Sequence, residues 1–305
     1  MKKTLLTLTV LATVFTATPA SAASRTVVHF DVAAGQQPEN VALEPDGSAD
    51  VTFAGARQVA RVDRAGRTRI LATLPAPTGG GGAPALGFPL TTGIVRTSDG
   101  TLYVLYATGT DDLTGLWRLR PGGTPVRIAA LPGTGLPNGL AFDSHRFYVT
   151  DSVLGTVWTV PFVGGAAKSW STAAELAPAG FLGANGAKLH DGALWVTNLD
   201  RGTVLRIPIL PDGRAGAPQV KATDLAGVDD FTFTGRGNEI LAALDSPNKV
   251  VRIGADGVAS TILDAADGLQ NPTSIAVRGN EVYVFSAAYL TQTDPNLLRT
   301  TLARC

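Results

Sequence analysis

The stretch LPNGLAF at residues 136–142 is one of six segments that share a pattern. Each has a residue with a side-chain oxygen, one spacer, and then a short apolar run that a turn follows. The six segments read PENVAL (38–43), LTTGIV (90–95), LPNGLAF (136–142), GANGAKL (183–189), GVDDFTF (227–233) and NPTSIAV (271–277). Their apolar residues in register are separated by 53, 46, 47, 44 and 44 residues. A repeat of this length is typical of solenoids, propellers and arrays, and it therefore decides the fold class.

Each repeat contains enough strand and turn signals for four antiparallel strands. In the third repeat we expect strands at 139–142, 146–151, 156–162 and 166–171, and the fourth repeat has the same order. Asp-Gly pairs recur where tight hairpin turns are expected, because glycine accepts the positive φ of such turns. Six repeats of four strands predict an all-β, six-bladed β-propeller over residues 23–305. A β-sandwich or two smaller barrels would leave the six in-register units unexplained.

The last repeat supplies too few strands for a complete blade. After its first strand, the sequence offers strands only at 281–287 and 297–303, whereas residues 25–32 precede the first repeat. A blade cannot cover its own faces, so the ring must close. We therefore expect the N-terminal strand to be the outermost strand of blade six.

The first 22 residues are typical of a cleavable signal peptide. Lys2 and Lys3 precede an apolar stretch at 5–17, and an Ala-x-Ala signal ends at Ala22. We expect cleavage near Ala22 and an exported protein without a stable membrane anchor, the alternative being an uncleaved anchor. Cys305 is the only cysteine, so it has no internal disulfide partner, and we expect an incidental exposed thiol.

The charge of the chain is balanced, with 25 basic and 25 acidic residues. Because the sequence contains no basic run, nucleic acid and anionic membranes are poor candidates as partners.

The six oxygen-bearing residues should meet at one mouth of the central channel, because the first strand of each blade lies innermost. Four of them, Glu39, Asn138, Asn185 and Asp229, offer only carboxylate and amide oxygens. Such a set suits a hard cation, and a roomy channel favours Ca²⁺ over Mg²⁺. The alternative is that the two Asn-Gly pairs are ordinary turns and that both carboxylates are solvated.

The six repeats and the Glu–Asn–Asn–Asp order resemble the regucalcin and gluconolactonase superfamily, whose relatives include paraoxonase and diisopropylfluorophosphatase. The resemblance spans nearly the whole mature chain. It implies that Glu39, Asn138, Asn185 and Asp229 hold one Ca²⁺ or another divalent ion. It also implies that this ion polarises a lactone carbonyl or a phosphoryl oxygen during hydrolysis.

The chain departs from this family at three positions. Leu136 stands where the sugar lactonases carry an arginine, and Thr92 and Thr273 stand where paraoxonase-type and phosphatase-type members use histidines. A stretch similar to a sugar-binding motif, at residues 96–100, is expected on the far face. The substrate is therefore expected to be a less polar ester or lactone.

The residues around the proposed ion supply the candidates for catalysis and substrate binding. No histidine is expected near it, so the bound ion would activate water, with Asp229 as the base and Asp230 as the second candidate. Phe88 and Phe181 are expected to wall the pocket or to pack against its rim. The substrate-binding candidates are Thr92, Tyr106, Leu136, Asp151, Asn198, Asp245, Thr273 and Tyr289. For Asp151, Asn198 and Asp245, the alternative role is to cap the turn that follows.

Three functions are compatible with this pattern. The first is an exported Ca²⁺-dependent hydrolase of a lactone or ester, acting on a small molecule. The second is a non-catalytic propeller that binds a ligand or protein and holds a structural calcium. The third is a condensing enzyme of the strictosidine synthase type.

Overall fold

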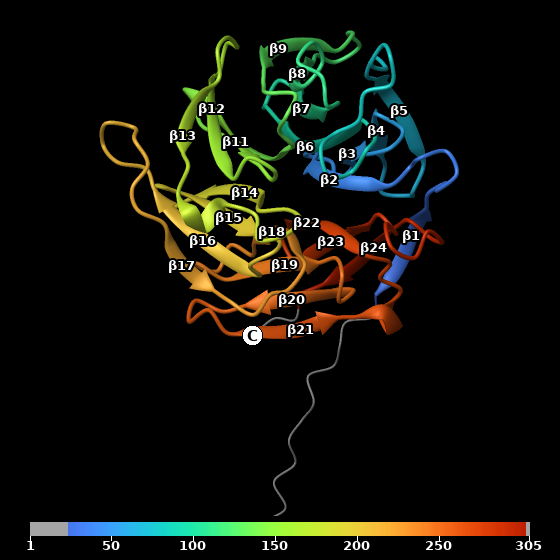
Figure 1. The fold of residues 1–305 in the computed structure, drawn as a ribbon. Helices are drawn as coiled ribbons and strands as arrows, with labels where there is room; N and C mark the ends of the chain where they lie inside the picture. Colours follow the sequence, from blue (N-terminus) through green and yellow to red (C-terminus); the bar gives the residue numbers. More distant parts are fainter. Residues whose placement is uncertain (1–23, 303–305) are drawn as a thin grey trace, which may run out of the picture.

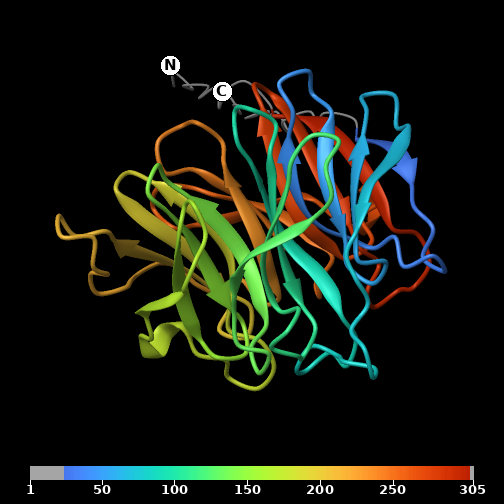
Figure 2. The same cartoon turned by 90° about the horizontal axis from the view of Figure 1, so that it is seen from above.

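The computed structural model describes residues 24–302, which form a ring of six four-stranded antiparallel sheets (Figure 1). Figure 2 shows the same ring turned by 90°. The predicted all-β, six-bladed propeller is confirmed. The expected signal peptide and Cys305 lie outside the described residues. Within residues 24–302, no helix is both long and apolar enough to cross a membrane.

The strands follow the chain from blade to blade. Blade one contains β2 (Pro38–Leu43), β3 (Ala49–Phe53), β4 (Gln58–Val62) and β5 (Thr68–Thr73), and blade two contains β6 (Leu90–Arg96), β7 (Leu102–Ala107), β8 (Gly115–Leu119) and β9 (Val126–Ala130). Blade three contains β10 (Pro137–Phe142), β11 (Arg146–Asp151), β12 (Thr156–Pro161) and β13 (Lys168–Ser171), and blade four contains β14 (Ala184–His190), β15 (Ala193–Asn198), β16 (Thr203–Pro208) and β17 (Gln219–Ala222). Blade five contains β18 (Val228–Phe233), β19 (Ile240–Leu244), β20 (Lys249–Ile253) and β21 (Ala259–Leu263). Blade six contains β22 (Pro272–Arg278), β23 (Glu281–Ser286), β24 (Asn296–Thr301) and β1 (Arg25–His29).

The N-terminal strand closes the ring, as the sequence predicts. Strand β1 pairs antiparallel with β24, placing Arg25 opposite Arg299 and His29 opposite Asn296, and it is the outermost strand of blade six (Figure 1). The sheet of blade six therefore contains the first and the last strand of the described chain, and this pairing closes the ring.

The innermost strands begin earlier than expected, and each carries an irregularity at its oxygen-bearing residue. In blade three the register shifts between Pro137 and Leu140, and in blade five between Val228 and Phe231. Blades one and four shift at the equivalent places. The oxygen-bearing residues of these blades therefore lie inside β-bulges rather than at the first residue of a regular strand. Bulges of this kind redirect side chains.

Threonine hydroxyls fix the spacing between neighbouring blades at the same level. Thr197 in β15 accepts a hydrogen bond from the backbone N–H of Gly186 at 2.7 Å and donates to the carbonyl oxygen of Asp229 at 2.5 Å. Thr150 in β11 bridges Gly139 and Asn185 in the same way. These contacts hold the backbones of two predicted ligands in place.

The close approach of blades three and four also explains why a glycine, Gly139, follows the oxygen-bearing residue Asn138. A Cβ at Gly139 would lie 2.3 Å from the carbonyl oxygen of Asn185 in the next blade. Any side chain there would force blades three and four apart. The Asn-Gly pair in β10 is therefore a packing requirement of the inner ring rather than a hairpin turn.

Candidate functional site

A cavity of about 740 Å³ opens at the channel mouth where the bulges lie. It is lined by residues of several blades, including all four predicted ligands: Glu39, Asn138, Asn185 and Asp229. Each of these residues is less than a tenth exposed. The structure thus brings together oxygens from blades one, three, four and five, which lie up to 190 residues apart in the sequence (39 to 229). Because Glu39 and Asp229 are buried, the alternative in which both carboxylates are solvated is wrong.

Glu39 shares its side of the cavity with Tyr289, which follows β23. The Tyr289 hydroxyl donates a hydrogen bond to Oε2 of Glu39. Burial raises the pKa of Glu39 to about 7, although the Tyr289 hydrogen bond opposes this rise. Burial also raises the pKa of Tyr289 well above its usual value. Glu39 is therefore a carboxyl group that titrates near neutral pH when no cation is bound.

Asp229 is a second perturbed carboxyl group of the cavity. Burial raises its pKa well above the usual value, and the negative charges of Glu39 and Asp245 add to the effect. A hydrogen bond with Asn185 opposes this rise.

The second amide, Asn138, is hydrogen-bonded within its own blade, because its Nδ2 donates to Oγ of Ser152 at 3.2 Å. Two amides and two carboxyl groups thus surround the same space.

Asp245, a predicted substrate-binding residue, is a third acidic residue in the cavity lining. Its Oδ1 atom is buried and has no hydrogen-bond partner among the described residues. Burial raises its pKa to about 6. An unpaired buried oxygen is costly unless a ligand, an ion or water satisfies it.

Apolar side chains surround this acidic floor. Leu136, which is fully buried, lines the cavity, and so do Phe88, Phe181 and Leu290, which are 36%, 49% and 66% exposed. The two phenylalanines thus wall the pocket, one of the two positions expected for them. The cavity combines a polar centre with an apolar rim, as small-molecule sites commonly do.

Three predicted substrate-binding residues lie outside the cavity lining. Thr92 is buried and donates to the carbonyl oxygen of Pro137 at 2.7 Å, and Thr273 donates to that of Pro38 at 2.8 Å. Both hydroxyls therefore join neighbouring blades. Tyr106 packs beneath the loop that follows blade one and donates to the carbonyl oxygen of Pro75 at 2.8 Å. The structure gives these residues packing roles instead.

Asp151 and Asn198 also lie outside the lining and cap local turns. Asp151 Oδ1 accepts hydrogen bonds from the backbone N–H groups of Leu136 at 2.9 Å and Leu154 at 3.0 Å. Asn198 Oδ1 accepts a hydrogen bond from the backbone N–H of Arg201 at 3.1 Å. The alternative capping role fits both residues, whereas Asp245 alone of the three reaches the cavity.

Asp230, the second predicted base, does not line the cavity either. Its carboxylate lies 2.7 Å from Nζ of Lys188 in blade four and accepts a hydrogen bond from Nδ2 of Asn40 in blade one at 3.0 Å. Blade six separates blades five and one in the ring, so Asn40 and Asp230 meet across the channel. Sequence reasoning missed this link, because both residues sit at bulge positions where no side-chain direction follows from strand alternation.

No histidine lines the cavity in the described part of the chain. His29 pairs with Asp294 at 2.6 Å on the outermost strand of blade six. His190 stacks on Phe233 with ring centroids 3.9 Å apart, and His145 lies in the exposed turn after β10. These positions match the expectation that no histidine lies near the four oxygen residues.

The cavity fits a hard divalent cation by its donor chemistry. Among residues 24–302, no three His, Cys, Asp or Glu side chains form a recognisable metal cluster. The candidate set instead combines Glu39 and Asp229 with the amide oxygens of Asn138 and Asn185, an all-oxygen set that suits Ca²⁺. The raised pKa values of the carboxyl groups follow from burying negative charges together, and a bound cation would offset that cost.

The chain is similar in fold to solved propellers of several chemistries. It shares 15% identity with regucalcin, a calcium-binding protein from Agrobacterium tumefaciens, over 92% of this chain and 93% of that chain, with a TM-score of 0.67. A gluconolactonase from Xanthomonas campestris shares 14% identity over 88% and 87% of the two chains, with a TM-score of 0.63. A virginiamycin B lyase from Staphylococcus aureus, solved with quinupristin, shares 17% identity over 88% and 82%, with a TM-score of 0.61.

No protein-family model matches the chain. No curated protein matches it significantly either. At these low identities the likeness to solved structures shows the fold alone, a propeller that this chain shares with the regucalcin and gluconolactonase structures. Because lactonases and a lyase share this fold, function has to be argued from the site.

Proposed function

We propose that this protein is an exported hydrolase of a lactone or ester that works with a divalent cation, most simply Ca²⁺. The observation that carries the proposal is the convergence of Glu39, Asn138, Asn185 and Asp229 in one cavity with an apolar rim. The fold shared with regucalcin and gluconolactonase structures supports it. Export rests on the sequence of residues 1–22.

The four oxygen residues would hold the cation from blades one, three, four and five. A bound Ca²⁺ would supply a Lewis acid that polarises the substrate carbonyl and activates water. The threonine bridges of Thr150 and Thr197 support the ligand backbones. The site is thereby built on the rigid inner ring rather than on mobile loops.

Proton transfer is assigned to carboxyl groups of the cavity. Asp229 would accept the proton of the attacking water, because its carboxylate lines the cavity where the cation and the substrate would meet. Asp245 is the second candidate, since its buried Oδ1 has no hydrogen-bond partner in the described residues. Asp230 is held by Lys188 and Asn40 and is left out of this role.

Substrate choice would follow from the rim. Leu136, Phe88 and Phe181 offer apolar contacts around the acidic centre. A polyhydroxylated sugar lactone would leave its hydroxyl groups facing these side chains without hydrogen bonds, which costs binding energy. We therefore place an ester or lactone with an apolar substituent ahead of an aldonolactone.

The test is a hydrolysis assay on the purified protein with and without chelator. Substrates would include γ- and δ-lactones with short and long alkyl substituents, a sugar lactone and an aryl ester. We expect turnover of the alkyl lactones or the aryl ester that chelator abolishes and Ca²⁺ restores. Asp229→Asn should remove it, and His145→Gln, a change in an exposed turn, should not.

Two results would overturn the proposal. Bound Ca²⁺ without turnover of any lactone or ester would favour the non-catalytic binding propeller. Conversion without uptake of water, seen by mass spectrometry as an elimination or condensation product, would place the protein with the lyase-type or condensing propellers.

A further inference from the structure

Asp245 is the third carboxyl group of the cavity, and it is not one of the four residues assigned to the cation. It directly follows β19, the second strand of blade five, and its backbone N–H donates to the carbonyl oxygen of Gly227 at 2.9 Å. Because β19 lies one strand farther from the channel axis than β18, Asp245 stands beside Asp229 on the outer side of the site. A carboxylate there borders the space that a substrate would fill next to the cation.

The hydrogen-bond register shows that this position adjoins the site in the neighbouring blades as well. In blades three, four and five, the residue directly after the second strand donates its backbone N–H to the residue two before that blade's predicted ligand. The pairs are Ser152 with Leu136, Leu199 with Gly183 and Asp245 with Gly227, at 2.9, 3.1 and 2.9 Å. Ser152 also accepts a hydrogen bond from the predicted ligand Asn138, and Leu199 lines the cavity. The place of Asp245 therefore follows from the repeat itself.

The fold does not use the side chain of Asp245. At the equivalent position, the hydroxyl of Ser152 donates to the carbonyl oxygen of Ala184 in the next blade at 2.7 Å. Asp245 contacts its next blade through the backbone instead, because its carbonyl oxygen accepts a hydrogen bond from Nδ2 of Asn271 at 3.2 Å. Its Oδ1 atom is buried and has no hydrogen-bond partner among residues 24–302. The backbone is thus fixed, while the carboxylate stays available to a ligand.

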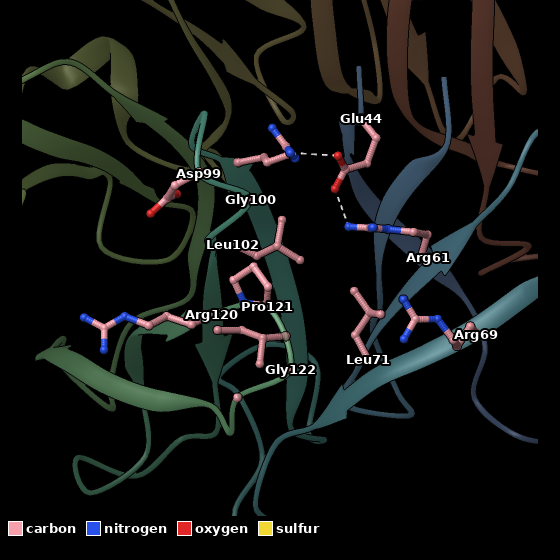
Figure 3. A pocket seen from close by; sticks show the side chains of 13 residues that line it. Glu44, Arg61, Arg69, Leu71, Asp99, Gly100, Leu102, Arg120, Pro121 and Gly122 are labelled. Carbon is pink, nitrogen blue, oxygen red and sulfur yellow. Dashed lines mark hydrogen bonds and ion pairs between the residues drawn. The ribbon is translucent and has the colours of Figure 1, made fainter. Parts of the chain in front are cut away.

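A buried carboxylate at the other end of the propeller shows the usual arrangement. Glu44, which is 8% exposed, binds Arg61 and lies 2.8 Å from Nη2 of Arg96 (Figure 3). Asp245 has no such partner, since none of the described residues that line the cavity is a Lys, Arg or His. An uncompensated buried charge is costly, so a ligand that brings a positive charge would stabilise this site.

The charges of the cavity indicate what the proposed cation leaves unbalanced. Glu39, Asp229 and Asp245 are the three acidic residues of the described lining. A divalent cation balances two carboxylates, so one negative charge remains when all three are ionised. Burial raises the pKa of Asp245 to about 6, and this carboxyl group is therefore largely ionised at about pH 8. The remaining charge favours a substrate with one positive group.

The surroundings of Asp245 also fit the rest of such a substrate. A primary ammonium group has three N–H donors, one of which would satisfy Oδ1, whereas a simple ester has none. Leu199, Phe88 and Phe181 line the same cavity and offer apolar contacts. A compact ligand can therefore place its ammonium group at Asp245 and its apolar body against these side chains.

We propose that Asp245 recognises a protonated amine of the substrate, which makes the substrate class an amine-bearing ester or lactone with an apolar body. This inference rests on the proposed function for the reacting group and adds the charged group beside it. It leaves Asp229 as the proton acceptor, because a carboxylate paired with an ammonium group does not take up the proton of water.

The test compares 3-phenylpropylamine with 3-phenyl-1-propanol by calorimetry on the full chain, at about pH 8 and low salt with saturating Ca²⁺. The two probes share the apolar body, and only the amine is charged at this pH. We expect the amine to bind at least about tenfold more tightly, as one charge-assisted hydrogen bond would give. Asp245→Asn should remove this difference and leave the affinity for the alcohol unchanged. Thermal unfolding checks that the variant is folded.

Asp256→Asn is the matched control, since it removes the same charge from blade five at an exposed turn outside the cavity lining. It should leave both affinities unchanged. Equal binding of the amine and the alcohol to the wild type, or an equal loss in both variants, would overturn the proposal. So would an Asp245→Asn variant that loses Ca²⁺ binding as fully as Glu39→Gln, because Asp245 would then be a ligand of the cation.

Binding is measured separately from turnover, so the two proposals can fail independently. Chelator-sensitive hydrolysis together with equal binding of the two probes would overturn amine recognition alone. Amine-selective binding that depends on Asp245, without hydrolysis of any lactone or ester, would overturn the proposed function and support the amine site.

Discussion

The hydroxyl of Tyr289 donates a hydrogen bond to Oε2 of Glu39, linking a loop of blade six to the first strand of blade one. Both residues line the acidic cavity, and the bond favours the ionised form of a carboxyl group whose pKa burial raises to about 7. Tyr289 therefore favours the carboxylate form of Glu39, which is the form that the proposed cation would need.

Tyr289→Phe should weaken Ca²⁺ binding at neutral pH. Without the hydroxyl, the pKa of Glu39 rises further, so a proton competes more strongly with the cation. We expect a loss of roughly two- to five-fold near pH 7 that disappears near pH 9, where Glu39 is ionised in both proteins. Calorimetric titration at both pH values measures this.

Tyr148→Phe is the control, since Tyr148 also donates to a carboxylate, that of Asp143 at 3.1 Å, but lies outside the cavity. A Tyr289→Phe loss that is equal at both pH values would contradict the proton-competition argument.

The metal-free protein should lose stability as the pH rises towards neutrality. Burial raises the pKa of Asp245 to about 6 and that of Glu39 to about 7, from usual values of 3.8 and 4.5. Between these values the folded chain holds protons that the unfolded chain has released, so the free energy of unfolding falls with increasing pH. Urea unfolding in chelator, at intervals from about pH 4 to about pH 8, tests this.

Asp245→Asn should flatten the lower part of that pH profile. Asp50 on the opposite face, with a pKa raised by burial to about 6, contributes in the same direction and should keep a residual slope. Stability that rises over this range would show that the cavity carboxyl groups are ionised in the metal-free protein.

Lys188→Met should destabilise the fold by about 3 kcal/mol, because it removes the cation beside a buried carboxylate. Nζ of Lys188 lies within 2.8 Å of both carboxylate oxygens of Asp230, which is 2% exposed. Adding Asp230→Asn should recover part of the loss, since the uncompensated charge disappears. Lys168→Met, at an exposed position in β13, is the control. Equal thermal stability of Lys188→Met and the wild type would contradict this role for the pair.

Thr197→Val should cost about 1–3 kcal/mol in unfolding free energy, because it leaves the buried groups of Gly186 and Asp229 without their shared hydroxyl. It should also weaken Ca²⁺ binding by loosening the Asp229 backbone. Thr159→Val serves as the control, since that hydroxyl makes only a 3.4 Å contact with the carbonyl oxygen of Lys168. A cost no larger than in the control would show that the bridge is dispensable.

The sequence period was sufficient to predict the ring and the four oxygens that meet in it. Because each first strand lies innermost, residues such as Asn138 and Asn185 had to converge once the repeats were in register. Leu136, Asp245 and Tyr289 followed from the same reasoning and do line the cavity.

Interactions between blades could not be predicted in this way. The pairing of Asp230 with Lys188 depends on how two bulged strands rotate their side chains, which strand alternation does not give. The threonine bridges did leave a signal, since Val-Thr recurs in second strands at 51–52, 149–150 and 196–197. Thr92 and Thr273 were predicted to bind substrate because they lie in register with the four oxygen residues. Their hydroxyls instead donate hydrogen bonds to backbone carbonyl oxygens of the next blade.

The most direct measurement is a calorimetric titration of Ca²⁺ into the chelator-treated protein, with Glu39→Gln and Asp229→Asn titrated alongside. Each variant keeps the shape of the side chain and removes one charge from the cavity. The account predicts one ion per chain, with each variant weakening binding at least about tenfold. A folded protein that binds no divalent ion, or two variants that bind it as the wild type does, would contradict the account.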